Sequence, residues 1–336
     1  MKTGGETVRD AGEFGCIERV CHDLLYRPEL VRTGAGDDGA VYVSPPGMDQ
    51  VISTDTMVEG IHFLRETMDA PDVGWKLCVS NFSDMAAMGA EPVQFVVAAS
   101  LPDTLPLRWL SGCYDGIREA CRAYGVNLLG GDTTGSRQGV VLTGTVIGIV
   151  PECRAVLRSG VREGDLLAVT GTLGDSAAGL DAIFRGQADR YPRLSVRHRR
   201  PVPQIRAAKI LREAGVHALD DITDGLASEA HEIARASGMD LLLRGGAVPL
   251  SDELRGAAAA FGKDPLAYAL FGGEDYQLLA AGSRECFETA AKEVPLTVIG
   301  RVLGRGGGVY IEKDTGREWL PRGGYDHFKE NSVTGG

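Results

Sequence analysis

Apolar and polar positions follow helical and strand periods in turn along the first half of the chain. In residues 107–125, apolar side chains recur every three or four positions and the pattern stops at Gly125, which predicts an amphipathic helix with a glycine end signal. Residues 71–90 predict a second helix, with Gly89 as its stop, and residues 12–26 predict a third.

Short apolar runs separate these helices and predict strands. The runs cover residues 51–58, 93–101, 126–132 and 140–150. Strands and helices therefore alternate in short units through this half of the chain.

The pattern changes after Pro151. A strand at 165–171 and a helix at 175–184 are followed by a polar, arginine-rich segment, residues 185–204, which we expect to be a long surface connection. Further helices are predicted at 205–214 and 224–238, and strands and helices alternate to about residue 315. We therefore expect a mixed α+β (α/β) fold with two domains, residues 1–150 and 151–336.

Composition narrows the class of protein. The 336 residues, 43% hydrophobic and 24% charged, are typical of a globular chain of two domains. A net charge of −11 disfavours nucleic acid or an anionic membrane as partner. We expect no membrane span, because no run of 18 apolar residues is present. Seven scattered cysteines without C-x-x-C are typical of free thiols, so we expect a cytoplasmic protein.

Acidic residues recur beside glycine or a hydroxyl residue where apolar runs end. They are Asp37, Asp38, Asp55, Glu59, Asp84, Asp132, Asp220, Asp221, Asp224, Glu274 and Asp275. Carboxylate oxygens suit Mg²⁺, which is usually shared with substrate phosphates. Each residue alone could be a turn former that bonds its own backbone. The recurrence favours a metal site that binds phosphate.

Asp84 supports this interpretation independently. Its predicted helix is apolar almost all round, as a buried helix is, yet Lys76, Ser80 and Asp84 are spaced four residues apart along one face. A buried carboxylate needs a cation. The cation is either a metal or the ammonium group of Lys76 in an internal network.

Residues 32–42, RTGAGDDGAVY, contain G-x-G-x-x-G, the dinucleotide-binding pattern. No clear strand precedes it and no long helix follows, as that pattern requires. Asp37 and Asp38 would repel a bare phosphate, whereas with Mg²⁺ the same loop can clamp one. No P-loop, H-E-x-x-H or G-x-S-x-G pattern occurs. His62 follows a predicted strand and is a candidate ligand contact, while His198 falls in the arginine-rich connection.

Several segments resemble one family in order along roughly residues 12–328. They are GAGDDGAVY, STDTMVEGIHF, VSNFSDMAAMGAEP, GGDTTGS, LRSG, RHRRPVPQI, DITDGLASEAHEIARASG, FGGEDYQLL and GYDHF. The chain resembles the thiamine-monophosphate kinases, of the superfamily of aminoimidazole ribonucleotide synthetase and selenophosphate synthetase.

The resemblance implies a fold and a reaction. The N-terminal α+β domain would bind metal and nucleotide, and its sheet would pair with that of a second subunit in a barrel-like homodimer core. The C-terminal α/β domain would close over the nucleotide. The enzyme would transfer the γ-phosphoryl group of ATP to thiamine monophosphate, giving thiamine diphosphate, with several Mg²⁺ ions.

The resemblance also implies a role for each site residue. Metal binding falls to Asp38, Ser53, Thr54, Asp55, Asp84, Asp132, Asp221 and Asp224. ATP contacts fall to Tyr114, Gly131, Asp132, Arg158 and Thr223. Thiamine monophosphate contacts fall to His62, Glu274 and Tyr325. The catalytic set within these is Asp55, Asp84, Asp132 and Asp224.

Some positions depart from the family pattern or have structural alternatives. Gly39 stands where alanine is commoner, Thr223 replaces serine but keeps the hydroxyl, and Gln277 replaces glutamate after GGEDY. On chemistry alone, Arg158 could instead form a surface salt bridge and Tyr325 could be a packing anchor.

Two other functions remain open at this stage. One is a related ATP-dependent enzyme with a different acceptor, as in aminoimidazole ribonucleotide or selenophosphate synthesis. Cys16 and Cys21 fall in a predicted helix rather than in a glycine-rich loop, which argues against selenophosphate chemistry. The other is a non-catalytic Mg-nucleotide sensor, which the full acidic set disfavours.

Overall fold

The computed structural model describes residues 6–35 and 39–324. Asp38 and Tyr325, two of the predicted contacts, lie outside these residues. The chain divides into two compact units, residues 1–85 with 91–153 and residues 86–90 with 154–336. Within the described part, no helix is both long and apolar enough to cross a membrane.

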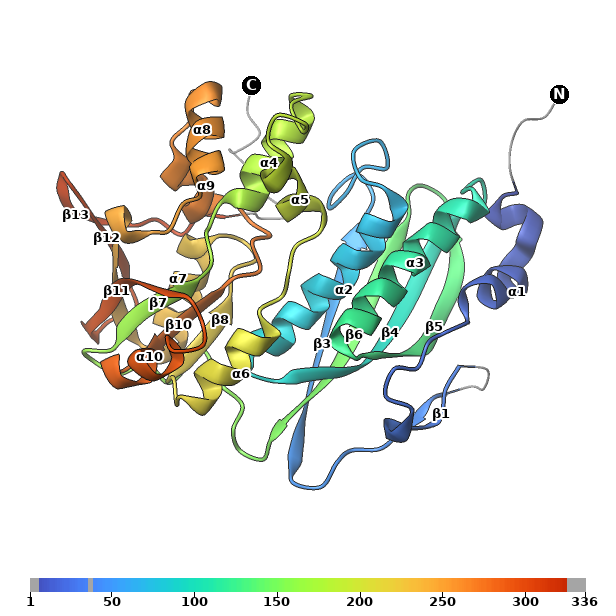
Figure 1. The fold of residues 1–336 in the computed structure, drawn as a ribbon, viewed down its shortest axis with the longest axis horizontal. Coiled ribbons are helices and arrows are strands. Elements are labelled where there is room, and N and C mark those ends of the chain that lie inside the picture. Colours follow the sequence, from blue (N-terminus) through green and yellow to red (C-terminus); the bar gives the residue numbers. More distant parts are fainter. Residues whose placement is uncertain (1–5, 36–38, 325–336) are drawn as a thin grey trace. The chain divides into compact units, whose positions relative to one another are not determined.

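The N-terminal unit is built on a four-stranded sheet in the order β3-β6-β4-β5 (Figure 1). The strands are β3 (Met48–Val58), β6 (Val141–Pro151), β4 (Glu91–Pro102) and β5 (Asn127–Ser136). Only β4 and β5 run parallel; the other neighbours are antiparallel. A small sheet of β1 (Val31–Thr33) and β2 (Val41–Tyr42) follows the short helix η1 (Pro28–Leu30).

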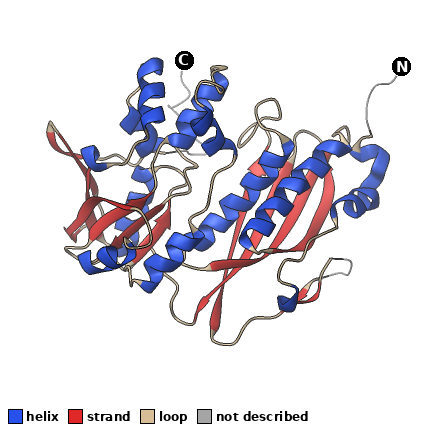
Figure 2. Ribbon diagram, in the orientation of Figure 1, coloured by secondary structure: helices blue, strands red, loops and turns tan. Residues whose placement is uncertain are grey.

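Helices α2 (Ala70–Ala87) and α3 (Leu107–Tyr124) lie over one face of this sheet (Figures 1 and 2). They cross so closely that a Cβ on Gly116 would lie 1.8 Å from the carbonyl oxygen of Pro71. The prediction that α2 is buried is confirmed, since Leu77, Phe82 and Met85 have no exposed surface. α3 ends at Gly125 in the left-handed conformation, as predicted.

The opposite face of the sheet carries no helix of this unit among the described residues. Side chains alternate along β3, so Ser53 and Asp55 face the helices while Ile52 and Thr54 face away. Ile52 is 70% exposed. The Thr54 hydroxyl donates to the carbonyl oxygen of Gly144 at 2.7 Å, within the sheet.

The C-terminal unit contains a seven-stranded sheet in the order β13-β12-β9-β11-β7-β10-β8. The strands are β7 (Leu166–Thr170), β8 (Ala218–Asp221), β9 (Met239–Arg244), β10 (Leu278–Gly282), β11 (Leu296–Arg305), β12 (Val309–Lys313) and β13 (Gly316–Trp319). Only β12 and β9 pair in parallel. Together with the first unit, this confirms the predicted mixed α+β fold.

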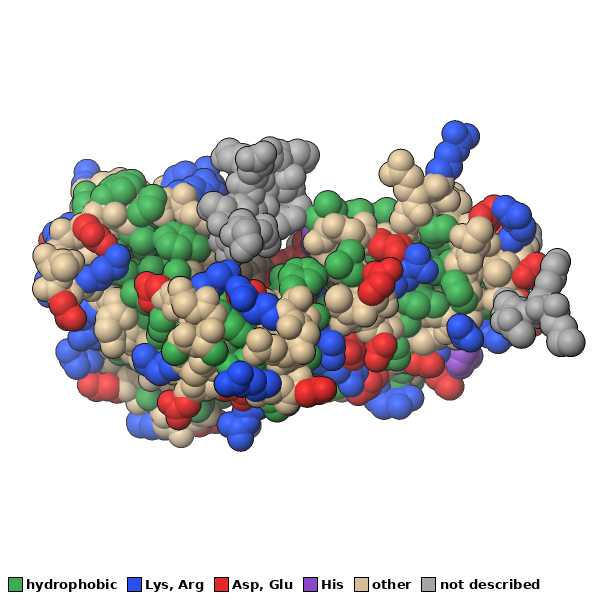
Figure 3. Space-filling view, turned by 90° about the horizontal axis from the view of Figure 1, so that it is seen from above, with side chains coloured by type: hydrophobic (Ala, Val, Ile, Leu, Met, Phe, Trp, Pro, Cys, Tyr) green, Lys and Arg blue, Asp and Glu red, His purple; other side chains and the backbone are tan. Residues whose placement is uncertain are grey.

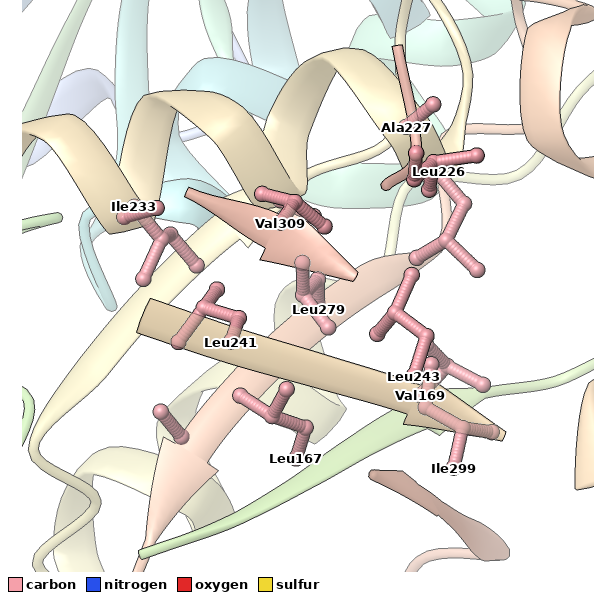
Figure 4. Packing of buried hydrophobic residues seen from close by; sticks show 14 of the residues in the cluster. Leu167, Val169, Leu226, Ala227, Ile233, Leu241, Leu243, Leu279, Ile299 and Val309 are labelled. Atoms are coloured by element: carbon pink, nitrogen blue, oxygen red, sulfur yellow. The ribbon is translucent and has the colours of Figure 1, made fainter. Parts of the chain in front are cut away.

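Helices cover both faces of the second sheet, because its strands are apolar on both sides. Leu226 and Ile233 of α7 (Leu226–Ser237) pack against Leu241, Leu243 and Leu279 (Figure 4). On the other face, α6 (Ile205–Glu213) and α10 (Arg284–Ala290) cover Ala168, Leu219 and Leu278. This core fixes the strand ends from which the site loops project.

A group of shorter helices completes this unit. It comprises α4 (Asp175–Phe184), α5 (Pro192–Arg199), α8 (Asp252–Phe261) and α9 (Pro265–Phe271), with the short helix η2 (Gly245–Ala247). The prediction that residues 185–204 form a surface connection is wrong, since α5 is helical and buries Leu194, Ser195 and His198. Arg193 and Arg197 of this helix are exposed, and the polar composition of the segment concealed its buried face.

The first helix also differs from expectation. α1 spans Val8–Val20 rather than 12–26. Thr7 caps it and forms a reciprocal capping box with Asp10, which sets its start. Cys21 follows its last turn, and Asp23 has a left-handed φ of 53°, so the helix cannot continue to residue 26.

Candidate active site

In the N-terminal unit, the structure brings Ser53, Asp55 and Asp84 together. The Ser53 hydroxyl donates to Asp84 Oδ2 at 2.5 Å, and the Asp55 carboxylate accepts from the side chain of Ser80. Ser53 and Asp55 are two residues apart on the strand, about 7 Å, and Ser80 and Asp84 are four residues apart on the helix, about 6 Å. The matching distances allow the Ser53–Asp84 and Asp55–Ser80 hydrogen bonds to form at once. The Asp55 and Asp84 carboxylates thereby lie at adjacent turns of α2, Asp55 reaching its turn from β3.

Asp55 is partly buried. Burial raises the pKa of its carboxyl group, and the hydrogen bond from Ser80 opposes this shift. The backbone N–H of Asp55 donates to Asn81 Oδ1 at 3.1 Å, which fixes this point of β3 against α2. A partly buried, oxygen-only donor set fits a hard cation such as Mg²⁺.

The described residues do not by themselves complete a metal site. Within 6–35 and 39–324, no three His, Cys, Asp or Glu side chains group as a metal ion would require. Asp132 lies on β5, with β4 and β6 between it and β3, about 14 Å away at the usual strand spacing. Asp132 is exposed and pairs in the sheet with the exposed Ala98, on the face that carries Thr54. The structure therefore separates Asp132 and Thr54 from Asp55.

The glycines of GGD have a structural reason of their own. Gly130 has φ +135°, and a Cβ on Gly131 would lie 1.7 Å from the carbonyl oxygen of Val97. A bulge at this point shifts the register between β4 and β5. The predicted ATP contact at Gly131 is thus on a strand segment that only glycine can form.

The turn after β3 holds His62 and Glu59 in place. The backbone N–H of Val58 donates to His62 Nδ1 at 3.0 Å, which places the proton of the neutral ring on Nε2. Glu59 accepts from the N–H of Val140 at 2.8 Å and pairs with Arg65. Glu59 therefore stabilises the turn, whereas His62 remains a candidate substrate contact.

Tyr114, a predicted ATP contact, lies on the buried side of α3. It is 7% exposed, and burial raises the pKa of its phenol. The role assigned to it stays a prediction.

In the C-terminal unit, two loops are joined by backbone hydrogen bonds. One follows β8 and carries Thr223 and Asp224; the other precedes β10 and carries Glu274. The N–H of Glu274 donates to Thr223 O at 2.7 Å, and the N–H of Tyr276 donates to Ile222 O at 2.9 Å. The predicted ATP contact and the predicted acceptor contact therefore lie side by side.

The second of these loops adopts unusual backbone angles. Glu274 has φ 67° and Tyr276 has φ 50°, both in the left-handed region that non-glycine residues avoid. A Cβ on Gly273 would lie 2.4 Å from the carbonyl oxygen of Thr223. Such strain, maintained by surrounding contacts, is characteristic of binding and catalytic loops.

Arg158 pairs with a buried carboxylate. Its Nε lies 2.9 Å from Asp220 Oδ1, and Asp220 has no exposed surface although the Arg158 side chain is 52% exposed. Burial raises the pKa of Asp220 to about 7, and the Arg158 guanidinium opposes the shift. This pair anchors one edge of Arg158 and leaves part of its side chain accessible.

Three further polar residues of this unit were not assigned a role from the sequence. Glu229 accepts from the N–H of Asp224 at 3.2 Å, and burial raises the pKa of its carboxyl group. Asp275 accepts from the N–H groups of Gly174 and Ser176. His198 is buried beside Glu274. Of the three, the sequence indicated only Asp275, as one of the acidic residues beside glycine or a hydroxyl residue.

Comparison with known proteins identifies the family of both domains. Residues 36–150 match the family model "AIR synthase related protein, N-terminal domain", and residues 162–312 match the corresponding C-terminal domain. Thiamine-monophosphate kinase of Bacillus subtilis is 34% identical over 328 residues, covering 94% of this chain and 99% of that protein. The Escherichia coli K12 enzyme is 37% identical over 327 residues, covering 94% and 98%.

Solved structures give the same result. Thiamine-monophosphate kinase of Stenotrophomonas maltophilia superposes with a TM-score of 0.79 at 32% identity, covering 88% of this chain and 95% of that one. AaThiL complexed with AMPPCP and TMP has a TM-score of 0.77 at 31% identity, covering 96% and 99%. Hydrogenase maturation protein HypE, at 23% identity and a TM-score of 0.73, shares the fold.

The matches of both domains to these family models define an AIR synthase-related protein. Within that group, the chain is about 35% identical over nearly its full length to several thiamine-monophosphate kinases. The chain belongs to the thiamine-monophosphate kinase family.

Proposed function

We propose that this protein transfers the γ-phosphoryl group of ATP to thiamine monophosphate, producing thiamine diphosphate and ADP. The observation that carries the proposal is the hydrogen bond joining Glu274, the proposed acceptor contact, to Thr223, the proposed nucleotide contact. A relative crystallised with AMPPCP and TMP, similar over 96% of this chain, supports both ligands.

Charge repulsion is the main physical obstacle to this reaction. ATP and the acceptor are both anions, and each unit adds carboxylates, Asp55 and Asp84 in the first and Asp221 and Asp224 in the second. Bound Mg²⁺ would neutralise this negative charge. We infer that Asp55, Asp84 and the hydroxyl of Ser53 would bind Mg²⁺ in the first unit and that Asp221 and Asp224 would bind it in the second, because their oxygen atoms match its preference.

The chain's own groups account for the remaining requirements. The acceptor phosphate is largely ionised near neutral pH, so its attacking oxygen needs no general base. Thr223 and Arg158 contact ATP, Glu274 and His62 contact the acceptor, and the rigid strand ends hold them in position. The transfer is direct and in line, without a phosphorylated protein intermediate.

We infer that the enzyme is a homodimer formed through the open face of the N-terminal sheet. Ile52 is 70% exposed there, and the face presents threonines in place of charged side chains along β3 and β6. An exposed sheet face of this kind normally pairs with another surface. ATP as substrate and seven free cysteines support a cytoplasmic location.

No nucleic-acid partner is proposed. The net charge is −11, and acidic and basic side chains are interspersed on the face in Figure 3.

A turnover assay with several acceptors tests the function. The protein is incubated with Mg-ATP and, separately, thiamine monophosphate, unphosphorylated thiamine, and formylglycinamidine ribonucleotide, the substrate of aminoimidazole ribonucleotide synthesis. We expect ADP and thiamine diphosphate in equal amounts with the first acceptor alone. Turnover with another acceptor, or nucleotide binding without turnover, would reject the proposal.

A further inference from the structure

Helix α5 brings a buried histidine to the loop that carries Glu274. His198 is 4% exposed. Its Nδ1 lies 3.3 Å from Ser176 Oγ and 3.5 Å from Glu274 Oε2. Neither the resemblance nor the proposed function gives this residue a role.

The position of α5 is fixed by close packing on α4. A Cβ on Gly179 of α4 would lie 2.1 Å from the carbonyl oxygen of Leu194, so the two helices touch backbone to backbone. Leu194 is 1% exposed and packs in a cluster with Leu254 and Tyr268. This packing holds α5, and with it His198, in a fixed position.

The first turn of α4 is tied to the same loop. Asp275 Oδ2 accepts from the N–H of Gly174 at 2.6 Å, and Oδ1 accepts from the N–H of Ser176 at 3.1 Å. The hydroxyl of Ser176 in turn lies against His198. Glu274 and Asp275, adjacent in sequence, are thus both held by the α4–α5 pair, Asp275 by α4 and Glu274 by α5.

This support matters because Glu274 has a left-handed backbone conformation, φ 67°. A carboxylate in such a conformation keeps one orientation only if neighbouring groups restrain it. With the proton on Nδ1, the His198 ring points an N–H toward the Glu274 carboxylate and the Ser176 hydroxyl.

We propose that His198 is a positioning residue for Glu274 and that it sets the affinity for the acceptor substrate rather than for ATP. The inference rests on the proposed function, in which Glu274 contacts thiamine monophosphate. Orienting the carboxylate before the acceptor binds removes part of the ordering cost of binding, which appears in the KM of that substrate.

A pair of matched substitutions tests the role of Nδ1. Asn carries its amide nitrogen near the position of Nδ1, whereas the amide of Gln lies near Nε2. We expect His198→Gln to raise the KM for thiamine monophosphate about tenfold, while the KM for ATP and kcat change less than about threefold. In His198→Asn, the KM for thiamine monophosphate stays close to the wild-type value. Equal losses in both variants, or an equal rise in the KM for ATP, would overturn the proposal.

A double-mutant cycle tests the dependence on Glu274. Glu274→Gln raises the same KM, and His198→Gln adds nothing further in the double variant, because the group it positions is already changed. Additive effects would show that His198 acts elsewhere. His231→Asn is the control, since His231 is also buried but its Nε2 bonds Leu320 O at 2.9 Å, a position that the shorter Asn side chain does not reach; it lowers the melting temperature without changing either KM.

A measurement without substrate separates this inference from the proposed function. The ¹⁵N chemical shift of the His198 ring is compared in the full-length wild type and Glu274→Gln. A changed Nδ1 shift supports the contact, and an unchanged shift overturns it. If the wild type makes no thiamine diphosphate, the proposed function fails. The ¹⁵N shift still decides whether His198 contacts Glu274.

Discussion

The backbone N–H of Glu274 donates a 2.7 Å hydrogen bond to the carbonyl oxygen of Thr223. These residues come from loops at neighbouring strands, β10 and β8, which pair antiparallel in the sheet. The bond makes the two loops one structural element.

Replacing Asp55 by Asn should separate catalysis from folding. Asn keeps the shape but loses the charge, so turnover should fall by about a hundredfold or more. Because burial disfavours the charged carboxylate, stability should stay constant or rise slightly. Steady-state kinetics and thermal unfolding measure both. Asp49→Asn on the same strand, where Asp49 accepts from the N–H of Cys153, is the control and should keep full turnover. An active Asp55→Asn enzyme would remove Asp55 from the site.

Arg158→Ala should affect both ATP binding and stability. The substitution removes the proposed nucleotide contact, so the KM for ATP should rise about tenfold or more. It also leaves Asp220 buried without its guanidinium, which should cost about 1–2 kcal/mol. Arg206→Ala breaks an exposed pair with Glu293 at 4.0 Å and should cost less than about 0.5 kcal/mol. An unchanged KM for ATP would mean that Arg158 serves only as a structural partner.

The open face of the N-terminal sheet should determine the oligomeric state. Ile52 is 70% exposed, so Ile52→Arg should not disturb folding but should place a charge in the dimer interface. Sedimentation velocity should show a dimer for wild type and a monomer for the variant. Phe184→Arg, at a 56% exposed position of α4, should remain dimeric. A monomeric wild type, or a dimeric Ile52→Arg protein, would contradict this interface.

Asp275 should make stability depend on pH. Burial raises its pKa to about 7 despite two backbone hydrogen bonds. In the unfolded chain the pKa is about 3.9. The folded state therefore holds more protons between these values, and the free energy of unfolding falls as the pH rises through 7.

Asp275→Asn lacks this titration. Between pH 5 and pH 8, the free energy of unfolding of the wild type should fall by about 3 kcal/mol relative to that of the variant. Urea unfolding at both pH values measures it. A difference that does not change with pH would show that Asp275 is ionised throughout.

The sequence predicted elements well where periodicity and end signals agree. α3 is strongly amphipathic and stops at Gly125, and both features depend only on local sequence. α5 was missed because its burial depends on Gly179 of α4, which allows a polar helix to pack backbone to backbone. A contact of this kind leaves no periodic signal.

The site was predictable in type but not in arrangement. Acids beside glycines identified Asp55, Asp84 and Asp224 as candidates, and Ser53 and Asp84 do meet. Strand alternation places Thr54 on the other face from its neighbours, which residue type alone does not indicate. Asp220 was noted as acidic, but its burial and pairing with Arg158 come from the tertiary fold.

Transfer of a labelled phosphoryl group tests the central claim most directly. The protein is mixed with Mg²⁺, [γ-³²P]ATP and thiamine monophosphate, quenched over a time course, and separated into protein, nucleotide and thiamine fractions. We predict that label leaves ATP and enters thiamine diphosphate in step with ADP formation, with none on the protein. Label released only as inorganic phosphate, or passing through a phosphorylated protein, would contradict direct transfer between two ligands held side by side.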